Sequence, residues 1–285
     1  MRALSKEISG FLRKRGISCR EICHGGTSVI KADIPEGGIR YIVPIDITAS
    51  CPDEARVQSD LISAAVADLR KTAPAAIITE DRWNRQKVMM QERLLAHLES
   101  FVPLYARNCE IRRIDKLEAA AFLDTAHSYG DAACRYRYGM FLKRHTGQRA
   151  TLASGIEPGM LVAVATFSNA RRWFKEGRDI LSYEWTRFAS LPGIRINGGM
   201  GKMLRHFINE VKPDDIMSYA DLEWSEGKVY QELGFDLEDR KGPVLFRIDD
   251  QWNRHPVKTD LPDGAGLFFM NYGSAKYRMK LTEYE

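Results

Sequence analysis

One stretch, Asp179–Phe235, restricts the folds open to this chain more than any other part of its sequence. It begins with an aromatic and β-branched run, Ile180–Ala189, which favours a strand. A Pro192-Gly193 turn leads to a glycine-rich loop, and a helical run follows as far as Val211. A second strand at 215–220 and an amphipathic helix ending in Leu-Gly-Phe complete the pattern. The stretch therefore predicts a strand–loop–helix–strand–helix unit.

The glycine-rich loop has the composition of a phosphate-binding turn. Its glycines let the backbone curl so that several N–H groups point into one hollow, and the following helix adds its positive N-terminal end. We expect it to bind a phosphate-bearing ligand through residues of the loop and the first helical turn: Arg195, Asn197, Gly198, Gly199, Met200, Gly201 and Lys202. An ordinary surface turn is the alternative, because glycine is common in turns.

This arrangement resembles the GNAT superfamily of acyl-CoA-dependent N-acyltransferases. The family's loop reads Arg or Gln, two residues, Gly, one residue, then Gly or Ala; Arg195 and Gly198 match, and Met200 departs from it. A second match is Tyr-x-x-Leu-Gly-Phe at Tyr230–Phe235, where the family's tyrosine protonates the departing CoA thiolate. The resemblance implies acetyl-CoA or another acyl-CoA as cofactor and a small-molecule or peptide amine as acceptor. The fold class that we predict is α/β (α+β), with a mixed, mostly antiparallel sheet flanked by helices in the C-terminal part.

A closer resemblance covers most of the chain. Segments at Tyr183–Phe188, Ser218–Asp221 and Gly273–Lys276 are similar, in this order, to GNAT-like domains of phage and mobile-element proteins, often attached to homing or very-short-patch-repair-type nucleases. Such a relationship leaves two functions open. The chain is an acyltransferase, or it is a catalytically silent GNAT-fold module that binds nucleic acid or protein in a mobile-element system.

Acyl transfer needs a base for the amine and an acid for the leaving group. We predict Tyr230 as the acid, Glu184 on the central strand as the base, and Asp221 as an alternative base or an anchor for the amine. His127 is a candidate for the substrate side of the site. Each has a structural alternative: a packing aromatic, a solvent-facing carboxylate, a cleft-edge carboxylate, or a histidine bonded at a helix end. The enzyme prediction requires that two neighbouring strands part beside Gly199.

Residues 1–100 predict a small α/β domain, and 101–285 the GNAT-like domain. The expected elements of the first are the helix Ser5–Arg15, strands Ser18–Cys23, Ser28–Ile34 and Arg40–Ala49, the helix Pro52–Arg70 with Val57, Leu61, Ala65 and Leu69 on its apolar face, the strand Ala75–Thr79 and the helix Asp81–Leu98.

This order resembles the restriction-endonuclease-like fold. Carboxylates stand at Asp33, Asp46, Glu80 and Asp81, but Thr48 occupies the place of the lysine that such nucleases need. We interpret the domain as a remnant without catalysis; a docking role and an active nuclease are the alternatives.

In the second domain, Asp115 with Glu118 has the spacing of a capping box and predicts a helix to His127. Strands at Cys134–Phe141 and Leu161–Phe167 should form an antiparallel meander with Ile180–Ala189. We predict polar connections at 143–159 and 169–177, an irregular segment at 250–263, a strand at 244–248 that pairs back onto the sheet, and a hairpin arm at 266–270. Arg171-Arg172-Trp173 either contacts an acidic partner or a phosphate, or is a group of solvated charges.

Composition narrows the remaining possibilities. The net charge of +4 is mildly basic, which allows nucleic acid as a further partner without requiring it. The five cysteines are scattered and lack the spacing of a zinc site, so we expect no metal. There is no long apolar run, so we expect a cytoplasmic protein with reduced thiols and no membrane segment.

Overall fold

The computed structural model describes residues 3–144, 155–175, 177–257 and 266–284. The chain divides into two compact units: unit 1 contains residues 1–100, 220–227 and 239–275, and unit 2 contains 101–219, 228–238 and 276–285. The sequence places a domain boundary near residue 100, but it does not reveal that two later segments return to unit 1. The predicted class is confirmed, since helices accompany mixed and mostly antiparallel sheets.

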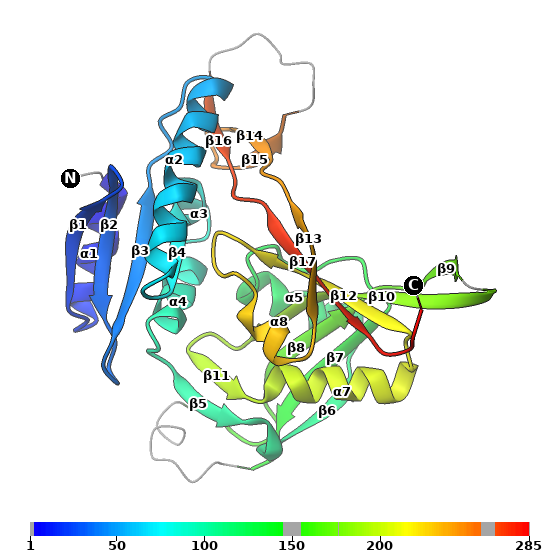
Figure 1. Cartoon of the computed structure of the whole chain (residues 1–285). Coiled ribbons are helices and arrows are strands. Elements are labelled where there is room, and N and C mark those ends of the chain that lie inside the picture. Colours follow the sequence, from blue (N-terminus) through cyan, green and yellow to red (C-terminus); the bar gives the residue numbers. More distant parts are fainter. Residues whose placement is uncertain (1–2, 145–154, 176, 258–265, 285) are drawn as a thin grey trace. The chain divides into compact units, whose positions relative to one another are not determined.

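Unit 1 is built on a four-stranded sheet in the order β1-β2-β3-β4 (Figure 1). The first three strands form an antiparallel meander, and β4 lies parallel to β3. The strands are β1 (Cys19–His24), β2 (Thr27–Asp33), β3 (Ile39–Ile45) and β4 (Ala75–Thr79). The parallel pair is joined through α2 (Pro52–Arg70), the crossover that parallel strands require.

Helices cover both faces of this sheet, because successive strand residues point to opposite sides. Val43, Ile45 and Ile77 pack with Ile62 and Leu69 of α2. On the other face, residues such as Ile42 and Ile78 pack with three helices, α1 (Ala3–Lys14), α3 (Glu80–Arg85) and α4 (Lys87–His97). The result is a helix–sheet–helix sandwich with strands that are buried on both sides.

Two predictions for these helices are wrong in detail. Ala65 and Leu69 of α2 are buried as predicted, but Val57 and Leu61 are 70% and 50% exposed. The rest of the buried face is formed by Ala55, Ser59, Ile62 and Val66. The helix has other apolar residues beside positions 57 and 61, and among these Ile62 and Val66 pack in the core with the sheet. The single helix expected over 81–98 is two helices, which meet at Gln86, where the backbone leaves the helical region.

The segment 239–275 adds a small sheet to unit 1 in the order β15-β14-β16. Its strands are β14 (Leu245–Ile248), β15 (Arg254–Pro256) and β16 (Leu267–Met270). The prediction that 244–248 pairs back onto the main sheet is therefore wrong. Its apolar residues Ile248, Phe269 and Tyr272 instead join the core beneath α2, which is a better burial site than an already covered sheet. Part of the irregular segment predicted at 250–263 lies outside the described residues.

The larger sheet has the order β13-β17-β12-β10-β8-β7-β6, with β9 paired to β10. Its strands are β6 (Cys109–Arg113), β7 (Tyr136–Leu142), β8 (Leu161–Phe167), β9 (Arg171–Lys175), β10 (Arg178–Ser190), β12 (Asp215–Asp221), β13 (Asp236–Lys241) and β17 (Ser274–Lys280). The predicted meander is confirmed as β7-β8-β10. The connection expected at 169–177 contains a strand, β9, and residues 145–154 of the other connection lie outside the described residues.

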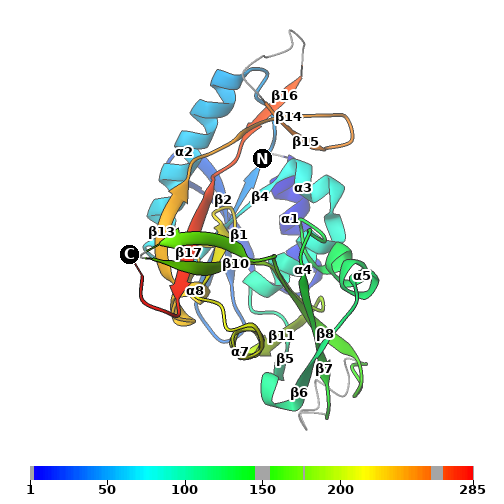
Figure 2. The same cartoon turned by 90° about the vertical axis from the view of Figure 1, so that its right-hand side faces the viewer.

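Two helices pack on opposite faces of the meander (Figure 2). Leu123 of α5 (Lys116–Ala126) packs with Val164, whereas Phe207 of α7 (Gly199–Val211) stacks on Phe167 at 3.9 Å between ring centroids. Asp115 caps α5 as predicted, because its carboxylate accepts the Glu118 N–H at 2.9 Å. Unit 2 also contains β5 (Val102–Tyr105), the short 3₁₀ helix η1 (Ala106–Asn108), β11 (Ile194–Asn197), which pairs with β5, and α8 (Lys228–Glu232). Across the described ranges, none of the helices is both long and apolar enough to cross a membrane.

Candidate functional site

The central strands β10 and β12 pair in parallel over only three residue pairs, from Ser182↔Asp215 to Glu184↔Met217. Both strands continue beyond that point. From Trp185 onward β10 pairs antiparallel with β8, and a bulge lies between Trp185 and Arg187. A bulge bends its strand and increases the local twist. The two strands therefore stop pairing just after Glu184.

The N-terminus of α7 lies at the same edge of the sheet as this split. The helix connects β10 to β12, and in a strand–helix–strand crossover the helix begins beyond the carboxyl ends of the strands. Gly198 precedes it with φ of +73°, a left-handed conformation that glycine adopts without strain. No side chain caps the first turn. Its amide groups are thus available to an anion.

Gly199 of the loop is also needed for packing. A Cβ atom on Gly199 would lie 3.0 Å from Ile196 Cβ, so the first turn of α7 lies close against β11. A Cβ atom on Gly201 would lie 3.3 Å from the end of the Leu233 side chain, which can move. Packing therefore requires glycine at 199 and not at 201.

The side chains around the loop have different environments. Arg195 is exposed, with its guanidinium 5.3 Å from the centre of the Phe101 ring, and Asn197 is exposed at the end of β11. Met200 is half-buried in the first turn of α7. Lys202 is held elsewhere, because its ammonium group donates to the carbonyl oxygens of Ala106 (2.8 Å) and Cys109. Of the predicted side chains, Lys202 is thus committed to an internal contact.

Tyr230 of α8 reaches the split between the strands. The Ser218 hydroxyl oxygen lies 2.9 Å from both the Trp185 carbonyl oxygen and the Tyr230 hydroxyl oxygen, so a side chain bridges β12 to β10 where backbone pairing has ended. The Tyr230 ring stacks on Tyr277 at 5.3 Å. Burial raises the pKa of Tyr230, against the opposing effect of the Ser218 hydrogen bond. The hydroxyl group is therefore protonated at neutral pH and oriented by its neighbours.

Glu184 occupies the last position of the parallel pairing. Its backbone N–H donates to the Ser168 hydroxyl at 2.9 Å, and its carbonyl oxygen accepts the Ser168 N–H at the same distance. The side chain is half-buried. Glu184, Ser218 and Tyr230 thus come from β10, β12 and α8 to the region where the strands separate.

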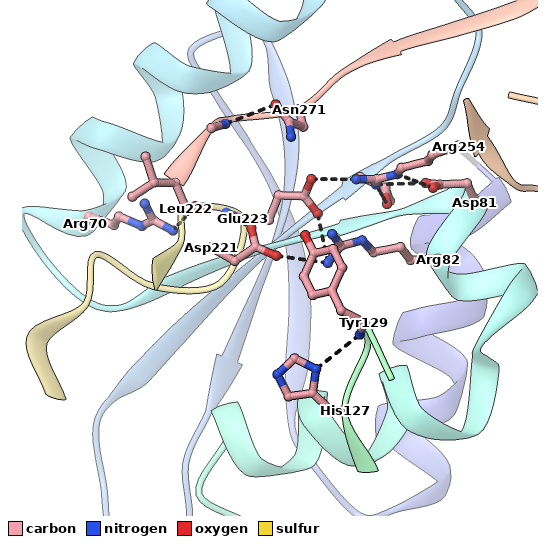
Figure 3. Close-up of polar contacts among 12 residues, drawn as sticks. Arg70, Asp81, Arg82, His127, Tyr129, Asp221, Leu222, Glu223, Arg254 and Asn271 are labelled. Carbon is pink, nitrogen blue, oxygen red and sulfur yellow. Dashed lines mark hydrogen bonds and ion pairs between the residues drawn. The ribbon is translucent and has the colours of Figure 1, made fainter. Parts of the chain in front are cut away.

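His127 lies at the C-terminal end of α5 in unit 2. Its Nδ1 atom accepts the Tyr129 N–H at 3.2 Å, as drawn in Figure 3, and the two rings are 6.1 Å apart. Accepting at Nδ1 requires an imidazole with no proton on that nitrogen. His127 therefore has the helix-end hydrogen bond that the sequence suggests as its structural alternative.

Asp221 belongs to unit 1 and is part of a buried ion-pair cluster (Asp81, Arg82, Asp221, Glu223 and Arg254; Figure 3). Its carboxylate lies 3.1 Å from the Arg82 guanidinium. Burial raises the pKa of Asp221, but the positive charges of Arg82 and Arg93 outweigh burial and hold it below the usual value. A carboxylate that is held in its charged form by arginines is a weak base.

Arg254 completes the cluster, and sequence reasoning missed it. It contacts the Asp81 carboxylate at 2.6 Å, the Glu223 carboxylate at 2.9 Å and the Thr79 hydroxyl at 2.9 Å. Asp81 and Glu223 are each 1% exposed, so an unpaired charge there would be costly. Only a lone arginine in a polar segment marks Arg254 in the sequence, and such a signal is too common to identify a buried partner.

The carboxylates predicted for a nuclease site in unit 1 bond to backbone N–H groups. One oxygen of Asp46 accepts the Leu4 N–H at 3.1 Å, and Glu80 accepts the Ile47 N–H at 2.8 Å. Burial, with a smaller contribution from Asp46, raises the pKa of Glu80 despite that hydrogen bond. Asp33 and Thr48 are exposed. Within the described ranges, no three metal-ligating side chains gather into a group that would hold an ion.

Comparison with known proteins yields matches among solved structures alone, since no protein-family model and no curated protein sequence matches the chain. The NatC complex bound to Gag peptide and CoA aligns at 12% identity and a TM-score of 0.36, covering 61% of this chain and 99% of the other. An acetyltransferase of the GNAT family from Bacillus anthracis aligns at 14% identity and 0.31, covering 61% and 95%. An N-acetyltransferase from Staphylococcus aureus aligns at 11% identity and 0.33, covering 61% and 97%.

Proposed function

We propose that unit 2 is an acyl-CoA-dependent N-acyltransferase. One observation carries the proposal: parallel pairing of β10 and β12 ends at Glu184, at the same sheet edge at which the uncapped N-terminus of α7 begins. A strand whose edge becomes unpaired offers backbone groups to an extended ligand, and a free helix N-terminus offers N–H groups to phosphates. The pantetheine arm and pyrophosphate of CoA have these two chemistries in sequence.

The residues present fit such a cofactor. The N–H groups of Gly199, Met200 and Gly201 precede the first intrahelical hydrogen bond, which the Lys202 N–H makes to the Gly198 carbonyl at 3.0 Å. These three would hold the pyrophosphate. The pantetheine would lie along β10 beyond Glu184, where it would share the carbonyl oxygens of Trp185, Thr186 and Arg187 with the side chains that donate to them. Met200 replaces the small residue of the GNAT pattern, but its backbone N–H is still present. A bound acyl-CoA supplies an activated acyl group on sulfur.

The protein's own groups then manage two protons. Glu184 takes a proton through a water from the acceptor ammonium, which frees the nitrogen lone pair to attack the acyl carbon. As the nitrogen–carbon bond forms and the carbon–sulfur bond breaks, Tyr230 would give its hydroxyl proton to the departing sulfur. The nitrogen of the new amide would release its extra proton to water, from which Tyr230 would recover one. The position of the Tyr230 hydroxyl at the strand split supports the acid role, and burial, which raises its pKa, keeps the hydroxyl protonated at neutral pH. The acceptor that we propose is a small-molecule or peptide amine.

Calorimetric titration with acetyl-CoA tests the cofactor site directly. We expect saturable binding to the full chain, and loss of at least tenfold in affinity in Met200→Glu, whose carboxylate would compete with the pyrophosphate for the helix N-terminus. Met200→Gln is the matched control, because it has nearly the same shape without the charge. Absence of heat and of any thermal shift at millimolar acetyl-CoA would refute the site.

For unit 1 we propose a nuclease-fold remnant that docks a partner, as in the phage and mobile-element proteins that the sequence resembles. Its meander followed by a parallel strand has the order expected of that fold. Of its candidate carboxylates, Asp46 and Glu80 are bonded to backbone N–H groups and Asp81 is paired with Arg254. Incubating the chain with supercoiled DNA and Mg²⁺ tests this. Nicking that Asp46→Ala abolishes would instead make unit 1 an active nuclease.

A catalytically silent unit 2 that binds nucleic acid or protein is the second candidate. The hydrogen bonds of Lys202 to two backbone carbonyl groups favour this candidate. Because its ammonium group is engaged there, it does not contribute a positive charge to a bound phosphate. Salt-sensitive DNA binding by a chain that shows no acetyl-CoA binding would select this candidate.

A further inference from the structure

The strand β9 and the start of β10 form an exposed antiparallel ribbon in unit 2, which we call the cationic ribbon (Arg171–Ser182; Figure 1). Pairing runs from Arg171↔Ser182 to Lys175↔Arg178. All five residues of β9 are exposed, and β9 lies off the main path of the sheet, so its outer edge is unpaired. The five side chains of β9 are therefore not part of the core of unit 2, so packing does not explain why they are cationic and aromatic.

Two large aromatic rings are exposed on this ribbon. Trp173 is 50% exposed and Phe174 is 76% exposed. Because they are consecutive in a strand, they lie on opposite faces. Water-exposed rings at adjacent positions have an unfavourable hydration free energy unless a partner covers them, so the pair marks a contact surface.

The ribbon is also positively charged. It contains Arg171, Arg172, Lys175 and Arg178 against two acidic residues, Glu176 and Asp179. Arg178 is bonded to the C-terminal segment, through Thr282 and the Glu283 carbonyl oxygen, and Lys175 lies 5.5 Å from the Tyr284 ring. Arg171 and Arg172 have no ion-pair or hydrogen-bond partner among the described residues. Their guanidinium groups are therefore available to an external anion.

Cations interleaved with exposed rings match one ligand best. Single-stranded nucleic acid presents phosphates for arginine and unstacked bases for aromatic rings, and base stacking tolerates any sequence. A bilayer is less suitable, because the two rings lie on opposite faces of the strand, whereas a segment that lies in a membrane interface buries its apolar side chains on one face. A folded acidic protein would use the arginines but has no need of two rings on opposite faces.

We propose that the cationic ribbon binds single-stranded nucleic acid. Arg171 and Arg172 neutralise two phosphates, and the rings of Trp173 and Phe174 stack on unpaired bases. The proposal is independent of acyl transfer, since it uses neither Glu184 nor the N-terminus of α7.

Fluorescence anisotropy of a labelled oligothymidylate, titrated with the full chain at several salt concentrations, tests the proposal. We expect Arg171→Ala with Arg172→Ala to reduce the magnitude of the slope of log K against log salt by about 1.4, which corresponds to two phosphate contacts on a single strand. Trp173→Ala and Phe174→Ala should each weaken binding by roughly five- to a hundredfold while the salt slope stays unchanged.

The control is Arg112→Ala with Lys116→Ala, which removes two exposed cations from β6 and α5 and should leave the salt slope unchanged. Thermal unfolding of the ribbon variants shows whether unit 2 is still folded, and this measurement does not depend on the acyltransferase proposal. Ribbon variants that bind the oligonucleotide as tightly as the unchanged chain would overturn the proposal. So would tighter binding to the matching duplex, or binding to phosphatidylserine vesicles without binding to the oligonucleotide.

Discussion

The buried ion-pair cluster of unit 1 and the strand split of unit 2 hold their polar groups in different ways, although unit 2 also has a buried ion pair away from the split, between Asp215 and Arg278. In unit 1, the buried carboxylates of Asp81 and Glu223 face Arg254, and Asp221 faces Arg82. In unit 2, the polar groups at the strand split are bonded to neutral partners: Tyr230 to a serine hydroxyl, and the Glu184 backbone to Ser168. Burial alone does not separate the two cases, since both regions are at least half-buried.

The difference indicates where chemistry is available. A carboxylate held between arginines keeps its charge at all ordinary pH values and contributes to folding, so it neither takes up nor releases a proton readily. A tyrosine held by a hydroxyl and by aromatic rings keeps a proton that it can still transfer. The carboxylates of the unit 1 cluster are thus engaged in ion pairs, whereas the Tyr230 hydroxyl at the strand split has only a neutral partner.

The largest expected effect tests the reactive half of this contrast. Tyr230→Phe should lower the rate of acyl transfer by roughly 10²- to 10⁴-fold, because the acid for the leaving group is lost. Acetyl-CoA affinity should stay unchanged, since the ring and its stacking on Tyr277 remain. Steady-state rates with an accepted amine give the first quantity and calorimetry the second. Tyr219→Phe is the control, and equal losses in both variants would remove the special role of Tyr230.

The next effect tests the structural half. Arg254→Met should lower the free energy of unfolding by about 3–5 kcal/mol, because it leaves the buried Asp81 and Glu223 without their shared cation. Urea unfolding followed by circular dichroism measures it. The same substitution at exposed Arg56, which contacts Asp53 at 3.1 Å, should cost less than about 1 kcal/mol. Similar costs at the two sites would show that the cluster contributes little.

A smaller effect concerns the protonation of His97 in unit 1, because the charged imidazolium would lack a negative partner among the described residues around its buried site. Burial, and then the cations Arg40 and Arg70, lower the pKa of His97 to about 4, although its hydrogen bond to the Tyr41 carbonyl opposes this. The unfolded chain therefore takes up this proton at higher pH than the folded chain. The stability contributed by neutral His97 is complete above pH ~6.5 and is lost as pH falls toward 4, by on the order of 2 kcal/mol.

Urea unfolding at a series of pH values checks this dependence. In His97→Gln, which keeps a donor for the Tyr41 carbonyl without a titrating ring, the slope between pH ~6.5 and ~5 should be flatter. An unchanged slope would assign the acid sensitivity to other groups.

The smallest effect separates the two glycines of the proposed phosphate-binding turn. Gly199→Ala should destabilise unit 2 by about 1 kcal/mol, because the new methyl group meets the branched carbon of Ile196 at 3.0 Å. Gly201→Ala should be neutral or slightly stabilising, since the end of Leu233 can move and alanine favours the helix by up to about 1 kcal/mol. Thermal unfolding of both variants measures the difference, and a reversed order would contradict the packing described for α7.

Local patterns in the sequence predicted much of the secondary structure. The helix Pro52–Arg70 and the strands at 75–79 and 161–167 have the predicted bounds, and Asp115 caps its helix. These features depend on neighbouring residues only: side-chain periodicity, a proline at the helix start, and a carboxylate within reach of the next N–H groups. The glycine-rich loop and the segment Tyr230–Phe235 could also be identified from the sequence, because each is a short motif of neighbouring residues.

Tertiary structure decided what depends on residues far apart in the chain. Arg254 neutralises Asp81 from 173 residues away. The strand at 245–248 lies in unit 1, although the segments 228–238 and 276–285 that flank this part of the chain belong to unit 2. The exposure of Val57 and the short parallel pairing that ends at Glu184 are of the same kind. Hydrogen bonding within a helix or turn is determined by residues a few positions apart. Which strand pairs with which, and which charge faces which, depends instead on distant segments: the favoured arrangement buries the most apolar surface and leaves no buried charge unpaired.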